Sequence, residues 1–195
     1  MRREGNVRIR LRDAALALFR ERGYDGTTAA EIAARAGVTE RTFFRHFPDK
    51  REVLFDGEAI LKSALVAAIA DAPADLGPLA TLFRAFRAFG PALEANRPYS
   101  EPRQAVIAAT PALQERELMK LAALTGALAD ALRARGVADL PADLAARTGT
   151  AAFVQATLAW LEDPEVGFEE RLDLAARELR GLLAGGDEEF DSCEG

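Results

Sequence analysis

The segment from residue 27 to residue 50, TTAAEIAARAGVTERTFFRHFPDK, restricts the fold of this chain more than any other. Thr28 and Glu31 have the spacing of a capping box, in which each side chain binds a free backbone N–H at the start of a helix. Gly37 suits a sharp turn, because glycine adopts a positive φ without steric cost. Thr39 can then cap another helix. The segment therefore predicts two short helices joined by a tight turn.

The second of these helices has an apolar side and a polar side. Phe43 and Phe47 are one turn apart, and we expect both to face the core. More outward directions are left to Thr39, Glu40, Arg41, Thr42, Arg45 and His46. A short polar helix held at a fixed angle is the means by which a helix-turn-helix reads the major groove of DNA.

Composition extends the helical prediction to the whole chain. Strong helix formers dominate the 195 residues, and no segment has the convincing period of two that a strand requires. A hydrophobic content of 49% is sufficient for one or two compact domains. We therefore expect an all-α fold of about nine helices, with an N-terminal three-helix helix-turn-helix domain and a larger helical body.

Apolar spacing, together with glycine and proline breaks, predicts the individual helices. The first covers about residues 6–22, and another runs from Lys50 to Ala70, from the head into the body. The pair Gly90-Pro91 is expected to stop the first helix of the body. The body helices are predicted at residues 76–89, 96–110, 111–135, 141–161 and 168–183.

Charge is divided unevenly along the chain. Residues 1–55 contain 12 Lys/Arg and 8 Asp/Glu, a net of +4, whereas residues 56–195 contain 13 and 23, a net of −10. A basic head on an acidic body indicates that only the head meets a polyanion. Arg8, Arg10 and Arg12 could also approach phosphates. The alternative is that the solvated helix faces differ in charge by chance.

The sequence offers few parts for other classes of protein. No apolar run approaches the roughly 20 residues of a membrane span, and the N-terminus lacks the apolar region of a signal peptide. The single Cys193 fits a reducing, cytoplasmic location. With one histidine and one cysteine, a catalytic triad or a metal site lacks partners, so we expect no enzyme, no metal and no cofactor. Glu169 and Glu170 suit the start of a helix, where acidic residues complement the dipole.

Several further residues keep the spacings of one known domain: Leu18-Phe19, Gly23-Tyr24, Thr27-Thr28, Ile32-Ala33, Ala36-Gly37-Val38-Thr39 and Thr42–Lys50. With them, residues 6–55 resemble the N-terminal domain of the TetR family of bacterial transcriptional regulators. The resemblance implies a regulator, most commonly a repressor, that binds operator DNA as a homodimer and responds to a small molecule. It suggests a DNA-binding domain at 1–50 and a sensing and dimerisation domain at 51–186. The acidic segment 187–195 is predicted to be disordered.

Carried over position by position, the resemblance implies nine DNA-contacting residues: Thr28, Thr39, Glu40, Arg41, Thr42, Phe44, Arg45, His46 and Lys50. Thr28, His46 and Lys50 would contact phosphates. Phe44 stands where the family usually has tyrosine, so a phosphate hydrogen bond is lost, although the ring can still contact a thymine methyl. Arg41 is the best candidate for a base contact, because its fork can donate two hydrogen bonds to guanine.

Two of these residues have alternative interpretations. Glu40 can accept a hydrogen bond from cytosine, form an ion pair within its own helix or discourage wrong sites. His46 can contact a phosphate or pack within the small domain. A ligand-independent or architectural DNA-binding protein also remains an alternative, and a footprint distinguishes it, since a short palindrome supports the regulator.

The family places its dimer interface on the last two long helices, here 141–161 and 168–183. Two such helices from each subunit would form a four-helix interface. The predicted interface residues are Leu144, Thr148, Ala152, Gln155, Leu172, Ala176, Leu179 and Leu183. The alternative is that both apolar stripes cover the core of their own subunit.

Members of the family hold an inducer inside the helical body. Apolar walls with few polar groups are the usual composition of a small-molecule pocket. The predicted lining residues are Phe83, Phe86, Arg87, Met119, Phe153, Thr157 and Trp160. They favour an apolar or aromatic effector, with Arg87 available for a carboxylate. The alternative is that these aromatic residues form ordinary core.

Overall fold

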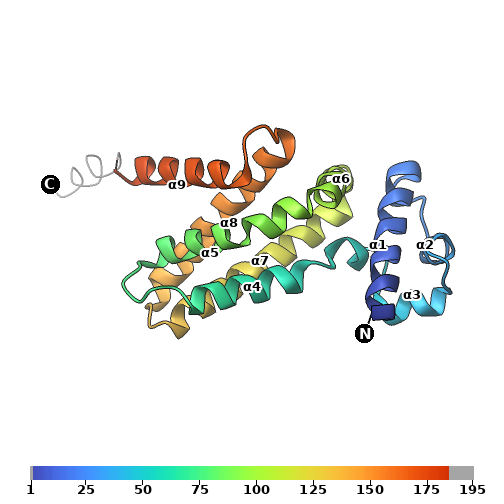
Figure 1. The fold of residues 1–195 in the computed structure, drawn as a ribbon, viewed down its shortest axis with the longest axis horizontal. Helices are drawn as coiled ribbons and strands as arrows, with labels where there is room; N and C mark the ends of the chain where they lie inside the picture. The colour runs from blue at the N-terminus through green and yellow to red at the C-terminus, as the bar shows by residue number, and fades with distance from the viewer. Residues whose placement is uncertain (1, 185–195) are drawn as a thin grey trace. The chain divides into compact units, whose positions relative to one another are not determined.

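The computed structural model describes residues 2–184 of the chain. These residues form nine α-helices and one short 3-10 helix, and none of them lies in a strand, so the predicted all-α class is confirmed (Figure 1). The predicted disordered segment 187–195 lies outside the described residues. The elements are α1 (Arg2–Arg22), α2 (Ala29–Arg35), α3 (Glu40–His46), η1 (Glu52–Phe55), α4 (Glu58–Ala70), α5 (Pro78–Ala95), α6 (Arg97–Ala108), α7 (Pro111–Ala134), α8 (Asp139–Glu162) and α9 (Phe168–Ala184).

Contacts divide the chain into two compact units. The first unit contains the chain up to Leu61 together with Pro98–Ala122. The second unit contains Lys62–Arg97 and the chain from Ala123 onward. The helix-turn-helix therefore shares its unit with most of α6 and the first half of α7. The functional division after residue 50 stays a prediction.

The first unit has one continuous hydrophobic core. It is built by side chains from six elements: Leu11, Phe19, Ile32, Phe43, Phe47, Leu54, Ile107 and Leu113, each no more than 3% exposed. Phe43 and Phe47 are buried, as their spacing predicts. Because Ile107 and Leu113 follow the helix-turn-helix by many residues, its core is completed by a distant part of the chain.

Side-chain caps fix the two short helices of the head. The capping box of α2 is confirmed: Glu31 N donates to Thr28 Oγ1 at 3.2 Å, and Thr28 N donates to Glu31 Oε2 at 2.8 Å. Gly37 turns the chain with φ +67°, which only glycine adopts readily. Thr39 then caps α3 by accepting from Thr42 N at 3.2 Å. These bonds set the angle at which α3 leaves α2.

The predicted continuous helix from Lys50 to Ala70 is wrong. The segment forms η1, and α4 begins only at Glu58. Val53, Leu54 and Phe55 are all buried, although three consecutive residues of an α-helix point to different sides. All three belong to the core of the first unit, so η1 is covered by the packed elements around it.

The predicted stop at Gly90-Pro91 is also wrong, because α5 continues to Ala95. Gly90 is buried, and a Cβ added there would lie 3.3 Å from the ring of Phe168. The glycine therefore serves a close approach of α5 to the start of α9 rather than a turn.

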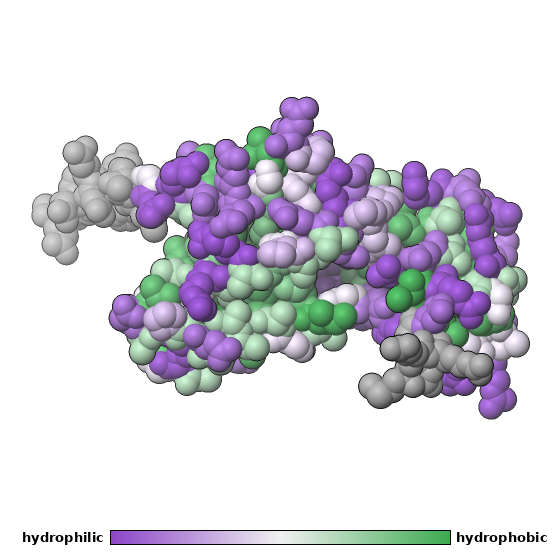
Figure 2. Space-filling model, viewed as in Figure 1, coloured by the Kyte–Doolittle hydropathy of each residue, from purple (hydrophilic) through white to green (hydrophobic). Residues whose placement is uncertain are grey.

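The second unit is held by packing of α5 against α8 and α9, with α8 and α9 in extensive contact (Figure 1). At Gly149 on α8 an added Cβ would lie 2.9 Å from Leu82 Cδ1 of α5, so the two helices cross closely. The Arg135 guanidinium donates to Ala72 O and Pro73 O, both at 2.7 Å, just beyond the end of α4. Figure 2 shows apolar side chains gathered over the visible face of α4.

Candidate nucleic-acid interface

The outer face of α3 carries most of the predicted DNA-contacting residues. Thr39, Glu40, Arg41 and Arg45 are exposed there, and Thr42 is half-buried, with its hydroxyl 3.0 Å from that of Thr39. Neither Glu40 nor the two arginines form an ion pair with another described residue, so the suggested pairing of Glu40 within its helix does not occur. Arg41 and Arg45 lie one turn apart, which gives α3 two free cations on one side.

Phe44 adds an exposed aromatic ring to this face. It is 51% exposed, and its ring meets the buried Phe43 edge-on, with 5.3 Å between centroids. An aromatic ring that is half open to water and rigidly supported from below is suited to apolar contact with a base or a sugar.

Thr28, the predicted phosphate contact at the start of α2, is exposed but already bonded. Its hydroxyl accepts from Glu31 N and lies 2.9 Å from Glu31 Oε2. Bonds from the Thr28 backbone N–H and hydroxyl lower the pKa of the Glu31 carboxyl. The phosphate contact at Thr28 stays a prediction.

Lys50 has a structural role that the sequence did not reveal. Its Nζ donates to Tyr24 O at 2.8 Å and Thr27 O at 2.9 Å, and it lies 4.1 Å from the centroid of the Tyr24 ring. The side chain thus fastens the loop between α1 and α2, immediately before the cap of α2. Its predicted phosphate contact would use the remaining N–H.

His46, at the end of α3, is half-buried. Its Nε2 is buried and has no hydrogen-bond partner within residues 2–184. Both the phosphate contact and the packing role proposed for this residue remain predictions.

A cluster of ion pairs fastens η1 to α7 within the first unit. The Glu52 carboxylate forms ion pairs with Arg116, with 2.6 Å between Oε1 and Nη2, and with Lys120, with 3.3 Å between Oε2 and Nζ. Lys120 also pairs with Glu58 at 2.5 Å, at the start of α4. On α6, Arg103 donates to Leu54 O at 2.6 Å. Sequence reasoning missed this cluster because its partners come from separate parts of the chain and have no periodic signal.

Four predicted pocket residues gather in the second unit, as a packed aromatic cluster. Phe83, Phe86, Phe153 and Trp160 are each at most 7% exposed. The Phe86 and Phe153 centroids are 4.7 Å apart, and Phe168, which the sequence analysis missed, contacts both Phe153 and Trp160. In this conformation the rings form core, as the alternative interpretation expects.

The other three predicted pocket residues are more exposed and are not part of this buried aromatic cluster. Arg87 binds carboxylates of its own chain, pairing with Glu169 at 3.1 Å and with Asp173. Met119 is 58% exposed and belongs to the first unit. Thr157 is half-buried, and its hydroxyl donates to Phe153 O of its own helix at 2.8 Å.

Two separate parts of the chain match known protein families. Residues 11–56 match the tetR family of bacterial regulatory proteins, and residues 76–184 match the MftR C-terminal domain. The transcriptional regulator TcmR of Streptomyces glaucescens is 32% identical over 182 residues, which cover 85% of this chain and 80% of TcmR. The chain belongs to the TetR family. It is therefore a DNA-binding transcriptional regulator, in a family of regulators rather than of enzymes.

Solved structures of TetR-family proteins share the fold. SmeT of Stenotrophomonas maltophilia, solved with triclosan, has a TM-score of 0.62 at 22% identity, over 88% of this chain and 90% of SmeT. FadR of Thermus thermophilus, a repressor solved with lauroyl-CoA, has a TM-score of 0.50 at 27% identity, over 87% of this chain and 91% of FadR. Within residues 2–184, no helix combines the length and apolar character that a bilayer crossing requires.

The residues predicted for the TetR-family dimer interface fall into two groups. Ala152 and Leu172 are only 6% and 0% exposed and pack in the core of their own chain, so their place in the interface stays a prediction. Five others remain at least partly accessible, and the side chain of Leu183 lies outside the described part. The accessible residues are Leu144, Thr148, Gln155, Ala176 and Leu179.

Proposed function

We propose that this regulator binds a palindromic operator as a homodimer and acts as a repressor that a small apolar or aromatic molecule releases. The observation that carries operator reading is the outer face of α3, where Arg41, Arg45 and Phe44 are exposed and neither arginine forms an ion pair with another described residue. A helix that fits the major groove with unpaired arginines can read guanine, while Phe44 can contact thymine.

A dimer follows from the geometry of DNA. Two heads that read a palindrome must be held about one helical turn apart, near 34–36 Å between half-site centres. Leu144 on α8 is 56% exposed, and a second copy of the chain would cover such an apolar side chain. This supports the interface predicted on α8 and α9.

Release by an apolar effector is supported by the aromatic cluster of the second unit and by FadR, the repressor solved with lauroyl-CoA. The effector would bind better to a state of the body in which these rings separate. Its differential affinity for that state would shift the population away from the conformation that fits the operator.

Selection of binding sites from random duplex DNA tests this function. We expect a palindrome with half-sites about one helical turn apart. Sequence-indifferent coating would instead support an architectural DNA-binding protein. With the operator in hand, a panel of fatty acyl and aromatic compounds should contain one that lowers operator affinity. Unchanged affinity across a saturating panel would argue against effector release while leaving operator binding intact.

A further inference from the structure

Three arginines near the start of α1 were equal candidates for phosphate contact, and the structure separates them. Arg8 pairs with Asp56 and lies 4.8 Å from the centroid of the Phe47 ring. Arg12 lies 4.0 Å from the centroid of the Tyr99 ring and pairs with Asp13 at 3.3 Å. Both guanidinium groups are therefore occupied within the first unit. Arg10 is exposed and forms no ion pair with any other described residue.

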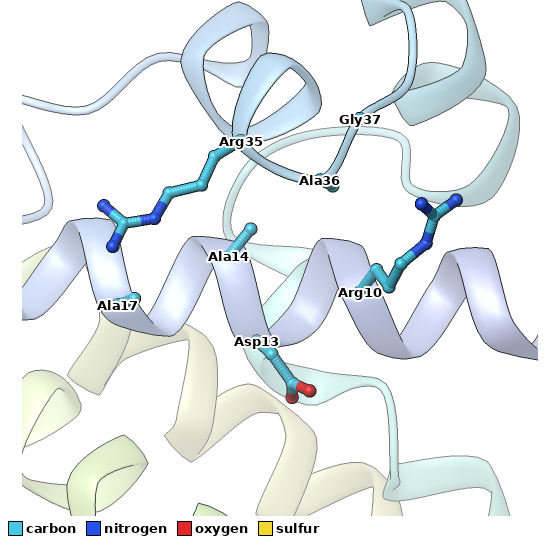
Figure 3. A pocket seen from close by; sticks show the side chains of 7 residues that line it. All are labelled: Arg10, Asp13, Ala14, Ala17, Arg35, Ala36 and Gly37. Atoms are coloured by element: carbon cyan, nitrogen blue, oxygen red, sulfur yellow. The ribbon is translucent and has the colours of Figure 1, made fainter.

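Arg10 borders an open recess beside the turn between α2 and α3. The recess has a volume of about 490 Å³ and is lined by Arg10, Asp13, Ala14, Ala17, Arg35, Ala36 and Gly37. Figure 3 shows Arg10 extending from α1 toward Gly37, while Asp13 points away from the turn. The recess exists because four of its lining residues are alanine or glycine, which leave room next to the Arg10 guanidinium.

The charges around the recess leave Arg10 as its available cation. Arg35, on the far side, is engaged by both oxygens of Glu21, at 2.5 and 2.7 Å. The Asp13 carboxylate is turned toward Arg12. An anion entering the recess would therefore meet the unpaired Arg10 guanidinium, with room for the tetrahedral oxygens of a phosphate.

The position of the recess relates it to the recognition helix. Arg10 Nη1 is 3.6 Å from the point where a Cβ of Gly37 would lie, and Gly37 precedes the α3 cap, Thr39, by two residues. A helix in the major groove, which is about 12 Å wide, is bordered on each side by phosphates. A cation next to the first turn of α3 is therefore close to one of these phosphate rows when α3 reads the bases.

We propose that Arg10 is a phosphate-binding residue of this regulator, and that its guanidinium holds a DNA backbone phosphate at the recess beside Gly37. The proposal rests on the reading of DNA by α3. Arg10 positions the head on the duplex and carries no sequence preference, because phosphate contacts are the same for every base pair. Arg8 and Arg12 instead hold the first unit together.

The salt dependence of DNA binding tests the proposal. Each phosphate contact that is lost reduces the slope of log affinity against log salt concentration by about 0.9. The Arg10→Gln variant should therefore show a slope that is shallower by about 0.9 for each bound head, on the selected operator and on random-sequence duplex alike. Its melting temperature should equal that of the wild type, because Arg10 bonds no other described residue.

Two further variants complete the test: one at another position of α1 and one at Arg10 itself. Arg20 is exposed, has no ion-pair partner in the described chain, and lies ten residues or about 15 Å further along α1. Arg20→Gln removes the same charge and should leave the slope close to that of the wild type. Arg10→Lys keeps a cation and should retain most of the slope.

An unchanged slope in Arg10→Gln, or an equal change in Arg10→Gln and Arg20→Gln, would overturn the proposal, since the second result reflects net charge alone. Failure of the wild type to select an operator would count against the proposed regulatory function instead. The slope on random-sequence duplex would still decide the role of Arg10.

Discussion

The Lys50 ammonium group satisfies two backbone carbonyls and faces the Tyr24 ring. We expect Lys50→Ala to lower the free energy of unfolding by about 1–3 kcal/mol, because partly buried carbonyls lose a charged donor. Urea unfolding measures this effect. Lys62→Ala, at an exposed position of α4, is the control and should unfold like the wild type. An unchanged unfolding midpoint in Lys50→Ala would refute the fastening role.

The same variant tests the predicted phosphate contact of Lys50. Loss of such a contact weakens binding about equally on all sequences and makes its salt dependence shallower. A variant that is less stable but keeps the wild-type salt slope would show that Lys50 acts on the fold alone.

The capping box makes helix α2 sensitive to acid. The pKa of Glu31 is lowered from 4.5 by hydrogen bonds to Thr28, so the folded state favours the carboxylate. A depressed pKa contributes stability that is present above 4.5 and is lost as the pH falls through the folded value. The wild type should therefore be more stable than Glu31→Gln at neutral pH, and this difference should shrink below pH 4.5. Thermal unfolding from pH 7 to pH 3 measures it; a constant difference would contradict the assignment.

We expect the Arg41 side chain to contact a base and so to read the operator sequence. Arg41→Ala is expected to weaken operator binding by about 1–3 kcal/mol and to relax the preference at one position of each half-site. A repeat of site selection with the variant checks this. An operator preference identical to that of the wild type would remove Arg41 from base readout.

At the scale of elements, η1 depends on the Glu52 carboxylate. This group binds Arg116 and Lys120 of α7 and is 16% exposed. Glu52→Gln should lower the free energy of unfolding by about 1–3 kcal/mol, because two cations lose a charged acceptor in a partly buried site. Calorimetry measures the change. Glu115→Gln, on an exposed part of α7, is the matched control; equal losses in both variants would contradict a specific role for Glu52.

Elements set by local chemistry were predictable from the sequence. The capping box of α2, the turn at Gly37 and the cap of α3 depend on residues within a few positions of each other. The two failures depend on distant contacts. Gly90 meets Phe168, which begins α9, and Val53, Leu54 and Phe55 of η1 are all buried in a core that distant elements complete.

The same distinction holds for the candidate sites. The exposure of Arg41 followed from helical spacing next to the buried Phe43, whereas Phe44 was placed on the DNA-contacting face only by the family resemblance. The contacts of Lys50 with the loop carbonyls and of Arg87 with Glu169 could not be predicted from spacing, because they depend on where separate helices come together. Such contacts cannot be predicted from the periodic pattern of apolar residues.

At the scale of the whole molecule, the proposed dimer has a direct test. Leu144 is 56% exposed on α8 within the predicted interface, and Leu118 is 67% exposed on α7 outside it. Leu144→Glu should shift the sedimentation of the protein toward the monomer and weaken operator binding, because it would place an unpaired charge in an apolar interface. Leu118→Glu should sediment like the wild type. Equal behaviour of both variants would argue against the α8 interface.

The core beneath α3 has a consequence for engineering. Phe47 and Leu54 share their hydrophobic core with Ile107 and Leu113, which come from α6 and the start of α7. A fragment cut after residue 56, where the match to the tetR family ends, would expose this apolar surface to water. Chimeras that exchange heads between relatives should therefore carry residues 98–122 with the head. The first unit, which contains the recognition helix, is built from two separate segments of the sequence, although it is one compact unit in space.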